Sequence, residues 1–287
     1  MTTSEGRKRS QSAVLTAAAR ALHRQEPEPL LDDYLALPLG GDDAKLLMER
    51  LQTELPREAL LAFSRWVAVR ARLPEDIISQ AIEDGVEQYV ILGAGLDSFA
   101  YRRHDLIDRV RVFEVDHPAS QAWKRSRLDE LGVECPAQLV FAPVDFEHQT
   151  LREGLDAAGF DSAARAVFSW LGVTMYLTTQ AIRSTLAAVA AGPPGTKIVL
   201  TYNQPPSALT GIGLQTEAAL RAIVAGMGEP MISTFLPGEI EELVRSEGFG
   251  DVTHFGPDEA KATYFAGRTD VTFGGAQRIV IGTVTGH

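Results

Sequence analysis

The sequence contains a single cysteine and far fewer basic than acidic residues. One thiol, Cys135, can form neither an intrachain disulfide nor a zinc site built from several cysteines. Lysine and arginine total 27 against 38 aspartates and glutamates, which gives a net charge of −11. Such a chain repels phosphate backbones and anionic lipid, and its one basic cluster, Arg7 to Arg9, lies in a polar terminus. We therefore expect neither nucleic acid nor a membrane surface as a partner.

Long apolar runs and signal segments are also missing. The chain has no stretch of 18 apolar residues, and no basic segment followed by an apolar one opens it. Together with the single thiol, these absences predict a cytoplasmic protein. The 287 residues are 45% hydrophobic and 23% charged, which is typical of a folded globular chain and favours one large domain with an elaboration.

Several catalytic signatures are absent as well. The sequence has no P-loop motif, no His-Glu-x-x-His, no Gly-x-Ser-x-Gly and no Cys-x-x-Cys. The histidines show no metal-like spacing, and the doublets Asp32-Asp33 and Asp42-Asp43 fit helix caps and turns better than a metal site. We therefore predict no bound metal.

The first 85 residues are predicted to be helical. Alanine content and the helical spacing of apolar residues predict helices over 11–22, 42–51 and 57–83. Prolines and glycines between positions 27 and 41 predict a loop, and Pro74 predicts a kink or a helix start. We expect residues 1–85 to form a helical lid on a core that spans 86–287.

From residue 86 onward, short apolar segments alternate with helical ones. Five segments are predicted strands: 88–92, 110–115, 138–142, 166–170 and 197–202. Helices predicted over 118–131, 151–158 and 179–191 separate them, which indicates an α/β fold with a parallel, Rossmann-like sheet. Two further strands, 251–255 and 278–284, follow a helix over 237–247. Residues 203–235, with a helix over 215–225, are predicted to form an insertion that caps the site.

A Gly-x-Gly pattern follows the first predicted strand. Gly93 and Gly95 let the backbone turn sharply and come close to a ligand. The second strand ends in Glu114 and Asp116, where a carboxylate typically binds the hydroxyls of a ribose. This arrangement predicts a bound nucleoside.

The residues after the turn distinguish between nucleoside cofactors. Ser98 stands where the nicotinamide dinucleotide fingerprint requires a third glycine or an alanine. Asp97 follows the turn directly and would repel a pyrophosphate. A sulfonium and an ammonium suit acidic surroundings, so the pattern favours S-adenosyl-L-methionine (SAM) over a dinucleotide.

Four motifs in order carry a family resemblance. They are Leu92-Gly-Ala-Gly-Leu-Asp-Ser-Phe-Ala-Tyr-Arg102, Phe113-Glu-Val-Asp-His-Pro118 with Lys124, Pro143-Val-Asp-Phe146, and Gly172-Val-Thr-Met-Tyr-Leu-Thr178. In these motifs the chain resembles the leucine carboxyl methyltransferase family, including its actinobacterial members and polyketide carboxyl O-methyltransferases, over roughly residues 70 to 202. The resemblance implies a seven-stranded methyltransferase sheet and SAM as methyl donor.

The resemblance also implies roles for particular residues. One position departs from the family: Leu171 stands where many relatives have a glutamate, and it can meet the cofactor's ammonium only through its backbone carbonyl. The other implied cofactor-binding residues are Gly93 and Gly95 beneath the cofactor, Asp116 on the ribose with Glu114 as the preceding acid, Asp145 and Phe146 on the adenine, and Arg70 on the methionine carboxylate.

The need for a catalytic base depends on the acceptor. A carboxylate is ionised at neutral pH and needs none, whereas a phenol or an alcohol needs one within hydrogen-bond reach. His117 is the best candidate base because it follows Asp116, although a helix-capping role is the competing interpretation. Tyr176 is positioned to reach an acceptor, or else packs half-buried.

The leading hypothesis is therefore a SAM-dependent O-methyltransferase. We expect it to methylate a carboxylate on a small natural product or at a peptide C-terminus. One alternative is a phenol or hydroxyl O-methyltransferase of secondary metabolism. Another is a methyltransferase fold that no longer methylates and serves as a binding module, an interpretation suggested by Leu171. A nicotinamide oxidoreductase is disfavoured by Asp97 and Ser98.

Overall fold

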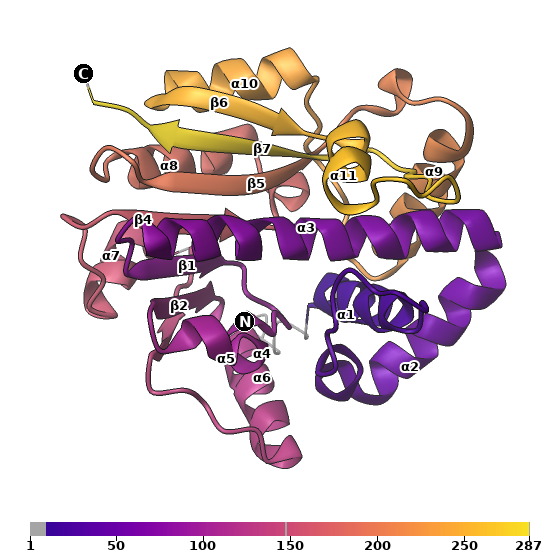
Figure 1. Cartoon of the computed structure of the whole chain (residues 1–287), viewed down its shortest axis with the longest axis horizontal. Coiled ribbons are helices and arrows are strands. Elements are labelled where there is room, and N and C mark those ends of the chain that lie inside the picture. The colour runs from indigo at the N-terminus through magenta and orange to yellow at the C-terminus, as the bar shows by residue number, and fades with distance from the viewer. Residues whose placement is uncertain (1–9, 147, 287) are drawn as a thin grey trace, which may run out of the picture.

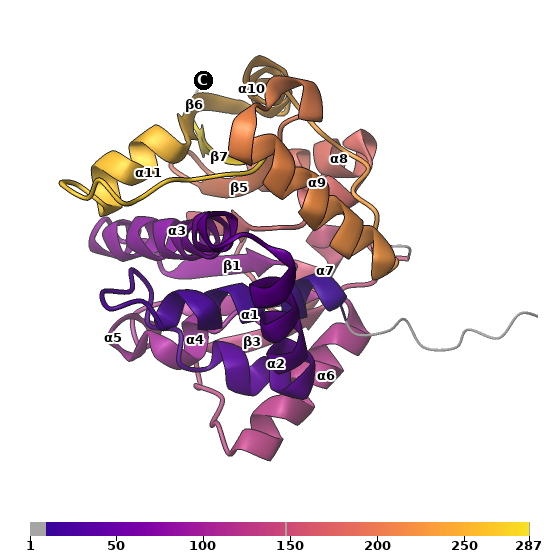
Figure 2. The ribbon, with the colours of Figure 1, turned by 90° about the vertical axis from the view of Figure 1, so that its right-hand side faces the viewer.

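The computed structural model describes residues 10–146 and 148–286 and is built on a seven-stranded sheet (Figures 1 and 2). The strand order is β3-β2-β1-β4-β5-β7-β6; the first five strands are parallel, and β7 runs antiparallel to both of its neighbours. The predicted Rossmann-like α/β sheet is thus confirmed. The strands are β1 (Gln88–Leu92), β2 (Arg111–Asp116), β3 (Leu139–Pro143), β4 (Ala166–Trp170), β5 (Lys197–Asn203), β6 (Phe249–Phe255) and β7 (Gln277–Val284).

Helices cover both faces of this sheet. Successive residues of β1 point to opposite sides, so that Tyr89 and Ile91 join one hydrophobic cluster and Val90 and Leu92 the other. Both sides are buried, which explains the continuous apolar strands. The helices are α1 (Gln11–Arg24), α2 (Ala36–Glu54), α3 (Arg57–Glu83), α4 (Phe99–Arg102), α5 (His104–Ile107), α6 (Pro118–Leu131), α7 (Leu151–Ala157), α8 (Thr179–Ala190), α9 (Gly211–Gly226), α10 (Pro237–Ser246) and α11 (Pro257–Tyr264), with short 3₁₀ turns η1 (Thr174–Tyr176) and η2 (Pro206–Ala208).

The helices of the first 85 residues pack on the sheet rather than apart from it. Val14 of α1, Leu47 of α2 and Ile78 of α3 share one hydrophobic cluster with Tyr89 of the first strand. Ile223 of α9 belongs to the same cluster, so the segment predicted to be a capping insertion meets the N-terminal helices (Figure 2). The predicted lid is therefore continuous with the core of the protein.

Two local predictions in this region need correction. The loop predicted up to residue 41 ends earlier, because α2 already begins at Ala36. Pro38 is accommodated in its first turn, where a backbone N–H is not required, and Gly41, with φ 61°, introduces a kink. The second correction concerns Pro74, where the alternative of a helix start is wrong because α3 runs through it from Arg57 to Glu83 (Figure 1); the alternative of a kink stays a prediction.

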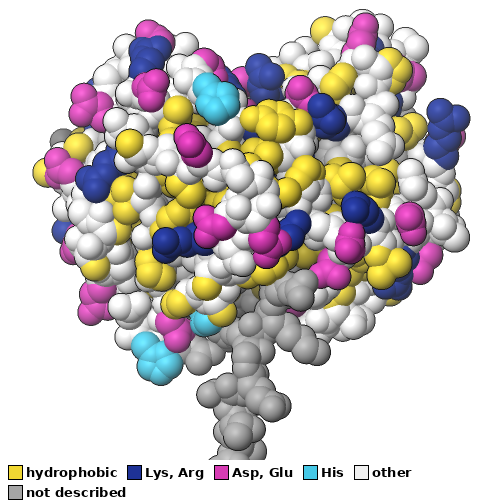
Figure 3. Space-filling view, turned by 90° about the horizontal axis from the view of Figure 1, so that it is seen from below, with side chains coloured by type: hydrophobic (Ala, Val, Ile, Leu, Met, Phe, Trp, Pro, Cys, Tyr) yellow, Lys and Arg dark blue, Asp and Glu magenta, His cyan; other side chains and the backbone are white. Residues whose placement is uncertain are grey.

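Three observations concern the surface charge, membrane spans and metal sites. On the face shown in Figure 3, Lys and Arg side chains are interspersed with Asp and Glu rather than gathered in one patch. None of the described helices is long and apolar enough to cross a bilayer. Within the described residues, no group of three or more His, Cys, Asp or Glu side chains could hold a metal ion.

Candidate active site

A cavity of about 540 Å³, here called the first cavity, opens beside the carboxyl ends of β1, β2 and β4. The strand order reverses between β1 and β4, which is where open α/β sheets bind ligands. The sheet contributes residues 91–97, Asp116 and residues 171–173 to the lining. The other side is lined from α1, α3, η1, residues 228–230 and Ile232, so the N-terminal helices and the segment after α9 close over the strand ends.

The predicted glycine turn lies in the wall of this cavity. Gly93 and Gly95 have φ values of 67° and 48°, a region that favours glycine. A Cβ at Gly93 would come within 2.5 Å of Val173 Cγ2, and one at Gly95 would lie 3.0 Å from the Cβ of Ala13 in α1. Both glycines therefore permit a backbone conformation and a close approach that a side chain would obstruct.

Asp116 also lines the first cavity, at the end of β2. Its carboxylate accepts hydrogen bonds from the backbone N–H of Gly95 at 2.6 Å and of His117 at 2.7 Å. Burial raises the pKa of Asp116, and these two hydrogen bonds oppose that shift. A carboxylate has about four acceptor sites, so Asp116 is held in place and can still accept from two hydroxyl groups.

Glu114 lies on the same face of β2 as Asp116, two residues farther from the end of the strand. It does not line the first cavity. The residue is fully buried, and its carboxylate pairs with Lys124 Nζ of α6 at 2.7 Å. Burial raises the pKa of Glu114 to about 7. The geometry gives this side chain a role in tying α6 to β2, and it does not support the predicted contact with a cofactor.

Arg70 of α3 brings an unneutralised guanidinium to the first cavity. The residue is 8% exposed, and Nη1 donates to Gln277 Oε1 at 2.9 Å. No carboxylate among residues 10–146 and 148–286 forms an ion pair with it. Burial lowers the pKa of Arg70 to about 10, so it remains cationic at neutral pH. A buried cation without an anionic neighbour, facing a cavity, is the feature expected of an anion-binding residue.

The segment after β4 brings Leu171 and Tyr176 to the same cavity. Its turn is fixed by Gly172, whose N–H donates to Thr201 Oγ1 at 2.7 Å. A Cβ on Gly172 would lie 3.0 Å from Arg70 Nη1, so the glycine lets the guanidinium approach the turn. Burial raises the pKa of Tyr176 to about 12. The phenol therefore stays protonated near neutral pH and can donate a hydrogen bond.

His117, the candidate base, is placed differently. It is the N-cap residue of α6, and its Nδ1 accepts from the N–H of Ala119 at 3.2 Å. It is not part of the lining of the first cavity. The geometry thus favours the helix-capping interpretation and does not support a role as base.

Asp145 and Phe146 follow β3 and also lie outside that lining. Asp145 pairs with His148 Nδ1 at 2.9 Å, and Phe146 is 56% exposed. The preceding Val144 donates its N–H to the carbonyl of Asp116 at 2.9 Å, which keeps this segment next to the end of β2. Their contact with an adenine ring stays a prediction.

Three charged residues of the first cavity were not predicted as ligands. Arg20 of α1, Asp97 after the glycine turn, and Glu229 after α9 all line it. Glu229 accepts from the N–H groups of Gln11 and Ser12, at 3.0 and 3.1 Å, and so holds the start of α1. Asp97 lies within the first of the four motifs, so its position could have marked it as a ligand. Arg20 and Glu229 carry no local signal, because only folding brings them to the strand ends.

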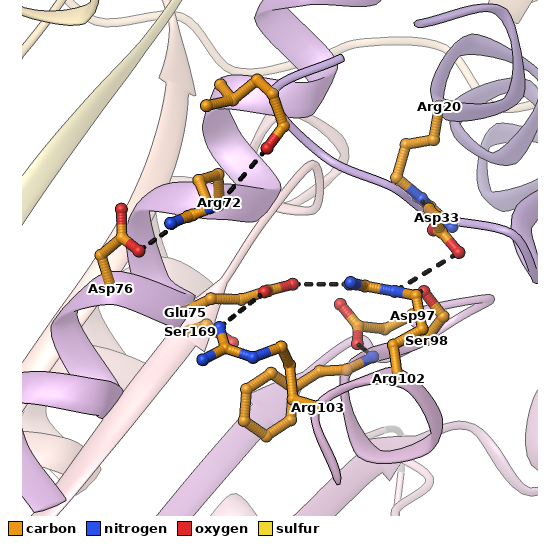
Figure 4. Close-up of polar contacts among 12 residues, drawn as sticks. Arg20, Asp33, Arg72, Glu75, Asp76, Asp97, Ser98, Arg102, Arg103 and Ser169 are labelled. Atoms are coloured by element: carbon orange, nitrogen blue, oxygen red, sulfur yellow. Dashed lines mark hydrogen bonds and ion pairs between the residues drawn. The ribbon is translucent and has the colours of Figure 1, made fainter. Parts of the chain in front are cut away.

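A buried ion-pair network surrounds Arg20 (Figure 4). Arg20 Nε lies 2.6 Å from Asp33 Oδ2, and its Nη2 donates to the carbonyl of Leu96 at 2.7 Å. Arg102 bridges Asp33 and Glu75, at 3.4 and 2.5 Å. Asp33 begins the predicted turn, because its carbonyl accepts from the N–H of Ala36 at 3.3 Å, but its side chain is buried between two arginines. The network connects the N-terminal helices to the loop that contains the two glycines.

A second cavity of about 70 Å³ adjoins the first. The two share five lining residues, Arg70 and Tyr176 among them. The rest of its wall comes from α1, α3, α9, η1, Met231, the end of β5 and the chain that enters β7. Most of these residues are apolar, and the members with polar groups are Trp66, Asn203, Glu217 and Gln277. Glu217 pairs with Arg221 at 2.8 Å, and burial raises the pKa of Glu217.

Comparisons with known proteins agree with this geometry. The family model described as leucine carboxyl methyltransferase matches residues 13–190. The Bacillus subtilis (strain 168) protein YktD, provisionally named a SAM-dependent methyltransferase, is 32% identical, with 91% of this chain and 93% of that protein covered. A provisionally assigned methyltransferase from Thermobifida fusca has a similar fold, with a TM-score of 0.59, 18% identity and coverage of 97% and 96%. Human N-acetylserotonin methyltransferase, solved in complex with SAM, gives a TM-score of 0.50 at 12% identity, with 96% of this chain and 67% of that chain covered.

Proposed function

Because this chain belongs to the leucine carboxyl methyltransferase family, we propose that it transfers a methyl group from SAM, its cofactor, to a carboxylate oxygen of a small-molecule or peptide acceptor. The observation that carries the choice of acceptor is the first cavity itself. Two arginines, Arg20 and Arg70, line it, and no histidine does so within the described residues. Such a site offers guanidinium groups to an anion beside the acids Asp97, Asp116 and Glu229, and it offers no histidine to remove a proton near neutral pH.

The residues of the first cavity fit the cofactor. Arg70 would hold the methionine carboxylate, and the backbone at Gly93 and Gly95, which lines the cavity, would lie beneath the ligand. Asp116 has two acceptor sites left for the ribose hydroxyls. Leu171 offers its carbonyl, and the unpredicted acids Asp97 and Glu229 supply the negative charge that suits an ammonium and a sulfonium.

The protein's part in the reaction would then be alignment. When bound, SAM supplies an activated methyl group that an ionised oxygen can take without any proton transfer. Holding the acceptor oxygen in line with that group is the main source of acceleration available to the enzyme. Tyr176, at the boundary of the two cavities, can donate a hydrogen bond that orients the acceptor, and α1 closes the site against water.

A hydroxyl acceptor is a second candidate, favoured by Glu217. This carboxylate lines the second cavity, and burial raises its pKa, which makes it a stronger base than an exposed glutamate. Its pairing with Arg221 at 2.8 Å limits that role.

The experiment that tests the proposal has two steps. Isothermal titration with SAM and with its demethylated product, S-adenosylhomocysteine, measures cofactor binding. Transfer of a radiolabelled methyl group to a panel of carboxylic acids and phenols then identifies the product class. Methyl esters release methanol in mild alkali, whereas methyl ethers do not. We expect alkali-labile product; label that survives alkali would move the assignment to a hydroxyl acceptor.

A further inference from the structure

Gln277, the first residue of β7, is the hydrogen-bond partner of the Arg70 guanidinium. Its Oε1 accepts from Arg70 Nη1 at 2.9 Å, and this is the one hydrogen bond that the guanidinium forms within residues 10–146 and 148–286. A neutral amide oxygen therefore takes one of the five N–H groups of the arginine. The other donors and the whole positive charge are left for a ligand in the first cavity, which Arg70 lines.

The neutrality of this partner matters because Arg70 is buried. A buried cation without a counter-ion is costly, and a glutamate in place of Gln277 would neutralise it. Such an internal ion pair would compete with the carboxylate of a ligand for the same guanidinium. An amide oxygen instead orients the arginine and leaves its charge uncompensated, which favours a ligand that brings an anionic group.

The orientation of the Gln277 amide is fixed by the sheet and by Asn203. The two residues are paired across the antiparallel strands β5 and β7. Gln277 Nε2 donates to Asn203 Oδ1 at 3.5 Å, so its Oε1 faces Arg70. Asn203 is 3% exposed and donates from Nδ2 to Met231 Sδ at 3.4 Å. Since Arg70, Asn203 and Gln277 all line the second cavity, the polar part of its wall serves as a support for the arginine.

Glu217 is the remaining charged group of this wall, and its charge is balanced elsewhere. Its carboxylate pairs with Arg221 Nε at 2.8 Å. Burial raises the pKa of Glu217, and Arg221 and the Asn203 side chain oppose that rise. Glu217 forms no ion pair with Arg70 among the described side chains, so the charge of Arg70 stays uncompensated although an acid lines the same cavity.

We propose that Gln277 is a positioning residue for Arg70 and that it gives the protein its preference for a cofactor with a carboxylate. It holds the guanidinium through a neutral oxygen and leaves the charge to pair with the methionine carboxylate of SAM. This inference rests on the proposed function, because it takes Arg70 as the residue that binds that carboxylate.

Two cofactors that differ by one carboxylate test it. Decarboxylated SAM keeps the adenosine, the sulfonium and the ammonium, and each compound is titrated calorimetrically into the wild-type protein and into Gln277→Glu. We expect the wild-type protein to bind SAM about tenfold or more tightly than decarboxylated SAM, because a hydrogen bond between charged groups is lost with the carboxylate. Gln277→Glu should weaken SAM by about ten- to 100-fold, because the introduced carboxylate occupies Arg70, and should not weaken decarboxylated SAM.

A second variant separates the lost hydrogen bond from the added charge and carries the test if Gln277→Glu does not fold. Gln277→Met removes the acceptor without adding a charge, and should weaken SAM about fivefold and leave decarboxylated SAM unchanged. Gln88→Glu is the matched control, because Gln88 is likewise the first residue of a strand, is buried and lines neither cavity. It loses its hydrogen bond to the Asp161 carbonyl and should lower the thermal stability while changing neither affinity.

An equal loss of affinity for both cofactors in the two Gln277 variants would overturn the inference, because a merely structural role predicts that result. Unchanged SAM affinity in both variants would also overturn it, as would equal affinities of the wild-type protein for the two cofactors. Absence of SAM binding by the wild-type protein is a separate result that would refute the proposed function itself.

Discussion

The first and second cavities differ in which parts of the chain build them. The first rests on strand ends, where backbone turns at Gly93, Gly95 and Gly172 and the carboxylate of Asp116 are fixed by the sheet. The second is lined largely by side chains of helices that are distant in sequence, such as Trp66 of α3 and Glu217 of α9, together with Asn203 of β5 and residues 274–277. A ligand contacted through backbone geometry leaves a local pattern in the sequence, whereas one recognised by packed helices does not.

We expect the largest loss of SAM binding from a substitution in the glycine turn of the first cavity. A control substitution distinguishes a steric clash from backbone strain as its cause. Gly93→Ala places a methyl group 2.5 Å from Val173 Cγ2, and we expect it to abolish measurable SAM binding in isothermal titration. Gly132→Ala is the control, because Gly132 has nearly the same φ, 65° against 67°, and nothing lies within 4 Å of its added Cβ. Retained SAM affinity in Gly93→Ala would break the assignment of this turn to the cofactor.

Arg70 lines both cavities, so substituting it tests which of the two ligands, SAM or the acceptor, depends on its charge. We expect Arg70→Met to raise the Kd for SAM about 30- to 150-fold, since a hydrogen bond between charged groups contributes about 2–3 kcal/mol. The control is Arg72→Met, on the same helix, where Arg72 pairs with Asp76 and lines neither cavity. If only acceptor binding suffered, Arg70 would belong functionally to the second cavity alone.

The ion-pair network predicts a smaller effect on the first cavity. Asp33→Asn removes the charge that holds Arg20, whose guanidinium donates to the Leu96 carbonyl in the glycine loop. We expect the Kd for SAM to rise about three- to tenfold, together with a lower free energy of unfolding, because one buried charge loses its partner. Thermal denaturation and titration of the same sample separate the two effects. An unchanged Kd would make the network structural only.

Glu26 provides the matched comparison, because it forms a buried ion pair with Arg65 at 2.7 Å and lines neither cavity. Burial opposes its ionisation, but hydrogen bonds from His23 and Arg65 lower the pKa of Glu26 from 4.5 to about 2. Its contribution to stability is therefore full above pH 4.5 and is lost as the pH falls toward 2.

We expect Glu26→Gln to lower the free energy of unfolding at pH 7 by about 1–3 kcal/mol, between the values typical of exposed and of buried pairs. The difference from wild type should shrink below pH 4.5 in urea denaturation, and the Kd for SAM should not change. A constant difference down to pH 3 would contradict the ionic origin of this stabilisation.

The sheet could be predicted from the sequence to a large extent, because a strand buried on both sides is a continuous apolar run. The predicted bounds of β1, β4 and α3 match the structure. The start of α2 was missed because its glycines signal a loop, although Gly41 only kinks the helix.

In the candidate site, the sequence could not show that Glu114 and Asp116 have different roles. The two side chains share one face of β2, but only folding shows that Lys124 of α6 takes the deeper carboxylate and leaves the outer one at the cavity. Glu229 was missed for the same reason, since its partners lie at the other end of the chain.

The hydrogen bonds between Glu229 and the first turn of α1 have a consequence for biosynthesis. They join residues 218 and 217 positions apart, so roughly 10 to 45 s of translation separate the emergence of the two partners. The body of α1 can already dock on α2 and α3, but its first turn waits for an acceptor from the last quarter of the protein. The first turn of α1 is thus made early and held in place late.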